Sequence, residues 1–339
     1  MPKNIVIFSD GTGQEGGKGA NTNIYKLFNM VEDRTSQQVA FYDRGLGTGW
    51  RKITGNIGGA GISKNIQECY TFIFENFEAG DQIYLFGFSR GAATVRSLTS
   101  FIHYFGILPK SRPELIKQAY KIYKTKDENK RKRKAKEFVS KHHTMWTRIK
   151  FLGCYDTVAA LGLPIKALSV LIDKIPWFQH KFQNFKLNET VENAYQALAI
   201  DDERKAFHPI LWDAESLPYQ SIKQVWFCGM HTDVGGGYNE QDLSDIPLTW
   251  MNAMAVKHGL ILYPSHSVSI NGDVNGHMHD SRGSGWTKLY PAKQRFWDSN
   301  RNDKPIIHSS VLLRKNNVKN DSSPAYKPWI LQHEYEIEQ

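Results

Sequence analysis

The clearest structural signal in this 339-residue chain is Gln82-Ile-Tyr-Leu-Phe-Gly-Phe-Ser-Arg-Gly-Ala-Ala93. Residues 82–86 predict a strand buried on both faces, because apolar side chains follow one another without polar alternation. Apolar residues at helical spacing from Ala92 to Ile102 predict a helix directly afterwards. A Gly-x-Ser-x-Gly sequence between a strand and a helix is the pattern of a nucleophile elbow, where a serine occupies a strained turn between small neighbours. We therefore predict that Ser89 is a catalytic nucleophile.

Strand and helix patterns alternate along the rest of the chain. Further strands are predicted at 4–8, 38–42, 149–155 and 223–229, and further helices at 23–31, at 63–80 and after residue 244. This alternation predicts an α/β fold, specifically an α/β-hydrolase-like, mostly parallel sheet with helices on both faces. We expect a single domain over residues 1–339, with a basic helical insertion at 110–148. A second helical insertion, a candidate lid, is expected at 160–212, and the tail beyond residue 271 is expected to wrap around the body.

The composition favours a protein with a large core, since 40% of its residues are hydrophobic. Three cysteines without a Cys-x-x-Cys pair argue against a disulfide framework and a zinc ribbon, so they are expected to fill the core. No histidine cluster has a third ligand at metal-binding spacing, and we expect neither a metal nor another cofactor. The N-terminus lacks a Sec signal pattern, so we expect a cytoplasmic location in the producing cell and any export to bypass that route.

The formal net charge of +9 favours anionic partners, such as a phospholipid surface. Eight lysines and arginines lie between Lys124 and Lys136, although most such runs are solvated helix faces. We expect peripheral membrane contact through 124–136 and through the apolar segment 165–178. Nucleic acid is not an expected partner, because no recognition motif accompanies the run and no aromatic residues are interleaved in it.

A serine nucleophile requires an imidazole that takes its proton and a carboxylate that orients the imidazole. In α/β-hydrolases the acid and then the histidine follow the serine along the chain. Asp233 is the favoured acid, because it follows a predicted strand and precedes three glycines that permit close backbone approach. Asp156 also follows a strand and is the alternative acid, or else a residue that supports the site. His279, on a predicted loop beside Asp280 and Ser281, is the favoured base.

Two further histidines and an oxyanion hole complete the predicted site. His308 is the main alternative base. His231 is another, although as the base it would precede the favoured acid and break the usual order. Two N–H donors are needed for the oxyanion of a tetrahedral intermediate. We expect one from the backbone of Arg90 and the other from Gly11 or Thr12, in the glycine-rich turn after the first strand.

Six motifs together resemble one known family. They are Asn4-Ile-Val-Ile-Phe-Ser-Asp-Gly-Thr-Gly13, Asn21-Thr-Asn-Ile-Tyr25, Phe86-Gly-Phe-Ser-Arg-Gly-Ala92, Asp156-Thr-Val158, His231-Thr-Asp-Val-Gly-Gly-Gly-Tyr238 and His279-Asp-Ser281. They resemble the catalytic domain of type VI secretion phospholipase effectors, over residues 4 to about 326. The resemblance implies a Ser-Asp-His esterase that acts on phospholipid acyl esters, with Ser89 as the nucleophile and a secretion or immunity protein as a partner.

The sequence leaves two alternatives to a phospholipase. One is a soluble carboxylesterase or acyl-carbohydrate esterase on the same scaffold. The other is a non-catalytic module that binds an anionic surface or nucleic acid, for which the basic charge is the argument.

Overall fold

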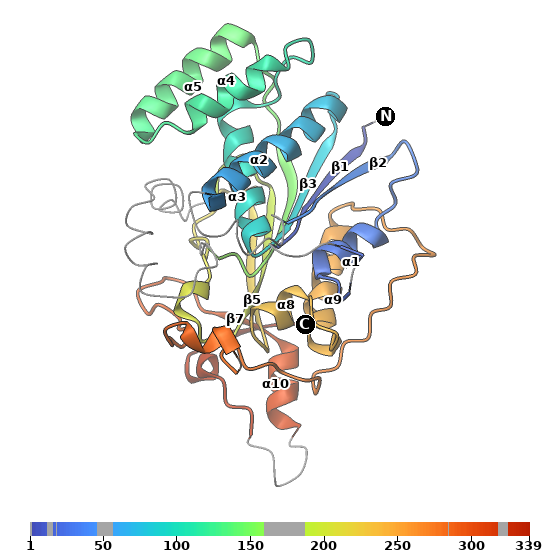
Figure 1. Ribbon diagram of the computed structural model, residues 1–339, viewed down its shortest axis with the longest axis vertical. Helices are drawn as coiled ribbons and strands as arrows, with labels where there is room; N and C mark the ends of the chain where they lie inside the picture. The colour runs from blue at the N-terminus through green and yellow to red at the C-terminus, as the bar shows by residue number, and fades with distance from the viewer. Residues whose placement is uncertain are drawn as a thin grey trace.

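The computed structural model describes residues 2–11, 16–17, 19–45, 57–158, 187–283, 285–317 and 325–339. At its centre lies an eight-stranded sheet in the order β2-β1-β3-β4-β5-β6-β7-β8, in which every neighbouring pair is parallel (Figure 1). The strands are β1 (Asn4–Ser9), β2 (Gln38–Asp43), β3 (Gln82–Phe88), β4 (Ile149–Tyr155), β5 (Asn193–Ala199), β6 (Ser221–Phe227), β7 (Ile306–His308) and β8 (Glu336–Glu338).

Helices cover both faces of the sheet, which confirms the predicted α/β-hydrolase-like fold. The α-helices are α1 (Asn23–Met30), α2 (Ile57–Asn76), α3 (Arg90–Phe105), α4 (Glu114–Tyr123), α5 (Glu128–His142), α8 (His231–Gly235), α9 (Asp242–Lys257) and α10 (Ser309–Asn316). Short 3-10 turns are η2 (Lys205–Phe207), η3 (Gly285–Leu289) and η4 (Trp329–Gln332). Within the described ranges, no helix combines the length and the apolar character needed to cross a membrane.

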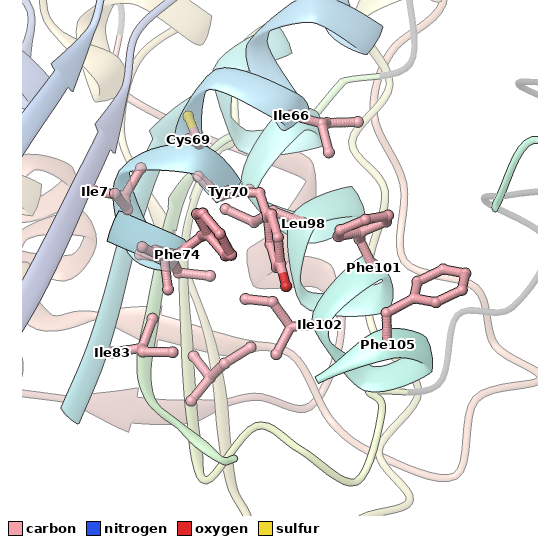
Figure 2. Close-up of a cluster of buried hydrophobic side chains, with 14 of the residues drawn as sticks. Ile7, Ile66, Cys69, Tyr70, Phe74, Ile83, Leu98, Phe101, Ile102 and Phe105 are labelled. Atoms are coloured by element: carbon pink, nitrogen blue, oxygen red, sulfur yellow. The ribbon is translucent and has the colours of Figure 1, made fainter. Parts of the chain in front are cut away.

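The two faces of β1 belong to two separate parts of the core. Ile5 and Ile7 pack with α2 and α3, while Val6 and Phe8 pack with α1 and α9. All four side chains are fully buried, which explains why this strand has an uninterrupted apolar sequence. Figure 2 shows the first of these clusters, in which α2 and α3 direct aromatic and aliphatic side chains toward each other. The three cysteines are free and buried, as predicted.

The predicted helical insertion at 160–212 is wrong in its second half. Residues 193–199 form β5, which lies between β4 and β6 and is buried on both faces. Its sequence misled the prediction because it contains three alanines and two polar side chains. Gln196 is fully buried, but its amide donates to the Ile210 carbonyl and to Gln224, so the polar group is satisfied inside the sheet. Residues 159–186, including the segment 165–178, lie outside the described residues.

The tail beyond residue 271 contributes more regular structure than expected. β7 and β8 extend the parallel sheet, and α10 follows β7 directly. Both strands have only three residues, which is too short for a detectable hydrophobic periodicity. Trp329 and Ile330 from this tail pack with Trp226 of β6 and thereby tie the tail to the sheet.

The basic insertion at 110–148 forms a hairpin of two helices, α4 and α5. It connects the end of α3 to the start of β4, and both points lie at the amino end of the sheet because α3 runs antiparallel to β3. The hairpin therefore lies at the opposite end of the sheet from residue 89 (Figure 1). Ala135 and Phe138 of α5 are buried, whereas Lys130, Lys132 and residues 133–134 are exposed.

We expect Leu98→Ala to lower the free energy of unfolding by about 2–5 kcal/mol, since it leaves a cavity in a packed core. Leu98 lies on α3 and is fully buried, as Figure 2 shows. Leu313→Ala, on α10, is the matched control, because Leu313 is 54% exposed. Chemical denaturation of both variants measures the difference, and equal losses would contradict the assigned core.

Candidate active site

Ser89 occupies the predicted strained turn between β3 and α3. Its backbone has φ 57° and ψ −118°, a conformation that residues other than glycine rarely adopt. A Cβ atom added to Gly87 would overlap the backbone of residues 91–92, and one added to Gly91 would overlap the Ser9 carbonyl. The sequence therefore needs glycine at both positions so that α3 can begin against β1. The Ser89 N–H donates to the Tyr155 carbonyl at 3.0 Å, which joins the turn to the end of β4.

The turn lies where the order of strands reverses. From β1 the chain passes to β2 on one side, and β3 then returns to the other side. The carboxyl ends of strands at such a reversal form the usual binding crevice of α/β sheets. Gly11, just after β1, lies beside Ser89, because a Cβ added to Gly11 would be 3.7 Å from the Ser89 Cβ.

The predicted oxyanion donors are only partly described. Arg90 is the first residue of α3, where a backbone N–H has no acceptor within the helix, as the prediction requires. The Gly11 N–H instead donates to the Asp10 carboxylate at 2.7 Å. Thr12 lies outside the described residues. The helix dipole of α3 favours negative charge at the same place as the Arg90 amide.

The favoured acid and base of the sequence prediction form a pair. His279 Nδ1 lies 2.6 Å from Asp233 Oδ1, and the His279 N–H donates to Asp233 Oδ2 at 3.1 Å. Burial raises the pKa of Asp233, although hydrogen bonds from Met230 and His279 oppose the rise. The ring of Tyr238 stacks on His279 with 3.7 Å between centroids. His279 Nε2 lies 3.6 Å from the Glu240 carboxylate.

The alternative acid and one alternative base form a second pair. His231 Nδ1 lies 2.5 Å from Asp156 Oδ2. Arg295 donates from Nη1 to Asp156 Oδ1 at 2.6 Å and from Nη2 to Oδ2 at 2.8 Å. Burial opposes ionisation of Asp156, but Arg295 and His231 outweigh it and hold the pKa of that carboxyl well below its usual range. Burial lowers the pKa of His231, so its ring favours the neutral form.

The second pair borders the serine turn. Asp156 follows Tyr155, whose carbonyl accepts the Ser89 N–H, and the His231 ring lies 4.7 Å from the ring of Phe88. His231 Nε2 is buried and has no hydrogen-bond partner within the described part of the chain. Between described residues, no hydrogen bond joins the Ser89 hydroxyl to a histidine ring. The pair thus places an imidazole, whose Nε2 has no partner among the described residues, beside the residue that precedes Ser89.

His308 is not brought to this place. It is the last residue of β7, which lies four strands from β3 and therefore roughly 19 Å away in the sheet. Its Nδ1 lies 2.9 Å from Ser310 Oγ, and its ring stacks on Phe227. Burial lowers the pKa of His308 to about 4. We assign it a structural role at the start of α10.

Arg295 is the site residue that sequence reasoning missed. It is 1% exposed and also donates to the carbonyls of Ala199 and Phe207. The sequence around it, in a polar tail, carries no periodicity or motif that distinguishes this arginine from a solvated one. Arg295 and Asp156 are 139 residues apart in sequence, and only the fold brings the guanidinium against the carboxylate.

One protein family matches residues 3–254, more than half of the chain: "T6SS, Phospholipase effector Tle1-like, catalytic domain". The chain belongs to this family. The family match spans Ser89 and both residues of the Asp156–His231 pair, while His279 lies beyond its end.

Several individual proteins are similar to this chain. "Uncharacterized protein YEL023C" of Saccharomyces cerevisiae is 28% identical over 257 residues, which cover 68% of this chain and 36% of the yeast protein. The chain thus spans well under half the length of that relative. An uncharacterized protein from Pseudomonas aeruginosa has 15% identity and a TM-score of 0.48, with 80% of this chain and 49% of that chain covered. The Tle1 effector, solved bound to the VgrG spike from the Type 6 secretion system, has 16% identity and a TM-score of 0.39, with 71% and 52% covered.

We expect Ser89→Gly to have a free energy of unfolding about 1 kcal/mol higher than Ser89→Ala, because glycine adopts a positive φ at little steric cost. Both variants lack the hydroxyl, so the comparison isolates the backbone. Chemical denaturation measures the difference. A Ser89→Gly variant no more stable than Ser89→Ala would mean that the turn stores no strain.

Proposed function

We propose that this protein is a serine hydrolase that cleaves acyl esters of phospholipids, with Ser89 as the nucleophile. The observation that carries the proposal is the left-handed backbone of Ser89 at the carboxyl end of β3, with the N-terminus of α3 directly behind it. A strained backbone at Ser89 costs free energy and does not stabilise the fold. It does expose a hydroxyl at the crevice where substrates bind in such sheets.

We assign the base to His231 and the acid to Asp156. These two residues restore the usual chain order of serine, acid and histidine, because His231 follows Asp156. Asp156 is next to the residue that binds the Ser89 N–H, and His231 contacts Phe88. The buried Nε2 of His231 has the free lone pair that a general base requires.

In this mechanism His231 Nε2 takes the proton of the Ser89 hydroxyl as the oxygen attacks the acyl carbonyl. The Arg90 N–H and the N-terminus of α3 stabilise the resulting oxyanion. His231 then gives its proton to the leaving alcohol, and a water molecule releases the acyl group by the same steps. Asp156 fixes the tautomer of His231 and stabilises its charged form, while Arg295 keeps Asp156 ionised.

The substrate class rests on family membership, since the family is named for phospholipase effectors. Contact of residues 124–136 with an anionic surface would involve the end of the molecule opposite Ser89, so we propose it as a separate binding property and not as a part of catalysis. The expectation of a secretion or immunity partner also rests on the family alone.

We expect a fluorophosphonate probe to label the parent protein and not Ser89→Ala, because only an activated hydroxyl attacks the phosphorus. Gel fluorescence measures the labelling. Ser100→Ala is the matched control, a partly exposed serine on α3 that should leave labelling unchanged. Labelling that persists in Ser89→Ala would refute the nucleophile assignment.

The same parent preparation tests the substrate class. We expect release of fatty acid from phospholipid vesicles as well as turnover of short-chain esters. Turnover of short-chain esters without fatty acid release would support a soluble carboxylesterase instead. Binding to anionic vesicles without any labelling would support a non-catalytic binding module.

We expect His231→Ala to lower kcat/KM by roughly 10³-fold, because it removes the general base. His279→Ala should lower kcat/KM only about tenfold, because it removes the partner of Asp233 and so disturbs only α8, the helix that carries His231. His308→Ala is the control and should leave kcat/KM near the parent value. Short-chain ester kinetics measure all three variants. The reverse ranking, with His279→Ala the more damaging, would transfer the base to the Asp233–His279 pair.

A further inference from the structure

Two segments that are distant from each other in sequence pack against Phe88 and Ser89. One is the turn after β1, where Gly11 lies against Ser89. The other is α8, which carries His231 and whose Gly235 lies against the ring of Phe88, since a Cβ added there would overlap it. The distance between these segments determines whether the base on α8 can reach the hydroxyl of a serine that packs against the turn after β1.

Thr22 binds the first segment. Its hydroxyl donates to Asp10 Oδ2 at 2.7 Å and accepts from the Tyr25 N–H at 3.2 Å, so the same oxygen caps α1. The other oxygen of Asp10 holds the Gly11 N–H. Thr22 and Asp10 are 1% and 2% exposed, which keeps water from replacing these bonds.

Asn23 binds the second segment. Its side-chain amide donates to the Val234 carbonyl at 2.9 Å, in α8, and to the Ser244 carbonyl at 2.8 Å, in α9. Thr22 also forms an antiparallel bridge with Gly236, which follows α8 and has φ 77°. A Cβ on Gly236 would come within 2.7 Å of the Asn23 N atom, so the two backbones touch.

The helix behind these two residues is itself fixed. Lys26 of α1 forms a buried ion pair with Asp245 of α9, with 2.6 Å between Nζ and Oδ1. Removal of one partner of a buried ion pair is strongly destabilising, so α1 has little freedom to shift relative to α9. The start of α1 is thus a rigid point to which both flanking segments are attached.

We propose that Thr22 and Asn23 are positioning residues that hold the turn after β1, where Gly11 packs against Ser89, at a fixed separation from the base-bearing α8. The inference rests on the proposed function. It accounts for the Asn21-Thr-Asn-Ile-Tyr25 motif, which has no part in the chemistry itself. Neither side chain touches the reacting atoms. Thr22 acts through the turn that packs against Ser89, and Asn23 acts through α8, which carries His231. Their loss would affect the transition state more than substrate binding, because the misplaced groups act on the developing charge.

The test measures kcat, KM and the free energy of unfolding of the full chain with a soluble short-chain ester. Thr22→Val keeps the shape of the side chain and removes its hydroxyl, whereas Thr22→Ser keeps the hydroxyl. We expect Thr22→Val and Asn23→Ala to lower kcat by about 10- to 100-fold with KM nearly unchanged. Thr22→Ser should recover most of the kcat.

Asn4→Ala is the matched control. Asn4 is also buried and donates two side-chain hydrogen bonds, to Gln38 and to the Gly259 carbonyl, but it lies at the amino end of β1, away from Ser89. Its loss should lower stability while kcat stays at the parent value. Equal kcat in Asn4→Ala and Asn23→Ala, or in Thr22→Val and Thr22→Ser, would overturn the inference. If Asn23→Ala does not fold, the Thr22 pair decides.

Fluorophosphonate labelling separates this outcome from failure of the proposed function. A parent protein that is not labelled would overturn both proposals. A labelled parent whose Thr22 and Asn23 variants retain its kcat and labelling rate would overturn the positioning role alone.

Discussion

The left-handed turn at Ser89 is the constraint on which the site depends. It exists because the backbones of β1 and α3 approach closely at Gly91, where no side chain fits. That approach aligns the start of α3 with the end of β1, and Gly11, just after β1, lies against Ser89. Free energy from the packing of α2 and α3 on the sheet maintains the strained turn.

Around this turn the chain places two carboxylate–imidazole pairs on one short helix. His231 and Asp233 both lie on α8, yet their partners come from the end of β4 and from the loop at residue 279. Residues of one helical turn separated by two positions point in different directions. One pair therefore faces the serine turn, while the other lies toward Tyr238 and Glu240. Because only the Asp156–His231 pair faces the serine turn, we assign the base to His231 and not to His279.

The sequence was sufficient for features that depend on local chemistry. The elbow around Ser89 and the strands at 4–8 and 149–155 were predictable, because each depends on small residues or apolar runs near one another. The choice of Asp233 and His279, which form a pair, came from the usual chain order of acid and histidine in this fold. β5 was not, since its alanines and Gln196 favour strand only when neighbours cover both faces. The ion pair between Asp156 and Arg295 was equally hidden, because nothing local distinguishes a buried arginine from an exposed one. In both cases the structure depends on contacts with residues far away in the sequence, which local patterns do not reveal.

The separation of the basic hairpin from the serine turn has a consequence for how the molecule adsorbs. Charge concentrated on α5, at one pole, gives the protein an electric dipole along its strands. Near a negatively charged support, such as a cation-exchange bead, the α5 pole would turn inward and the serine turn would face the bulk liquid. Immobilised molecules would then share one orientation, with Ser89 toward the dissolved esters, and added salt would release them by screening the attraction.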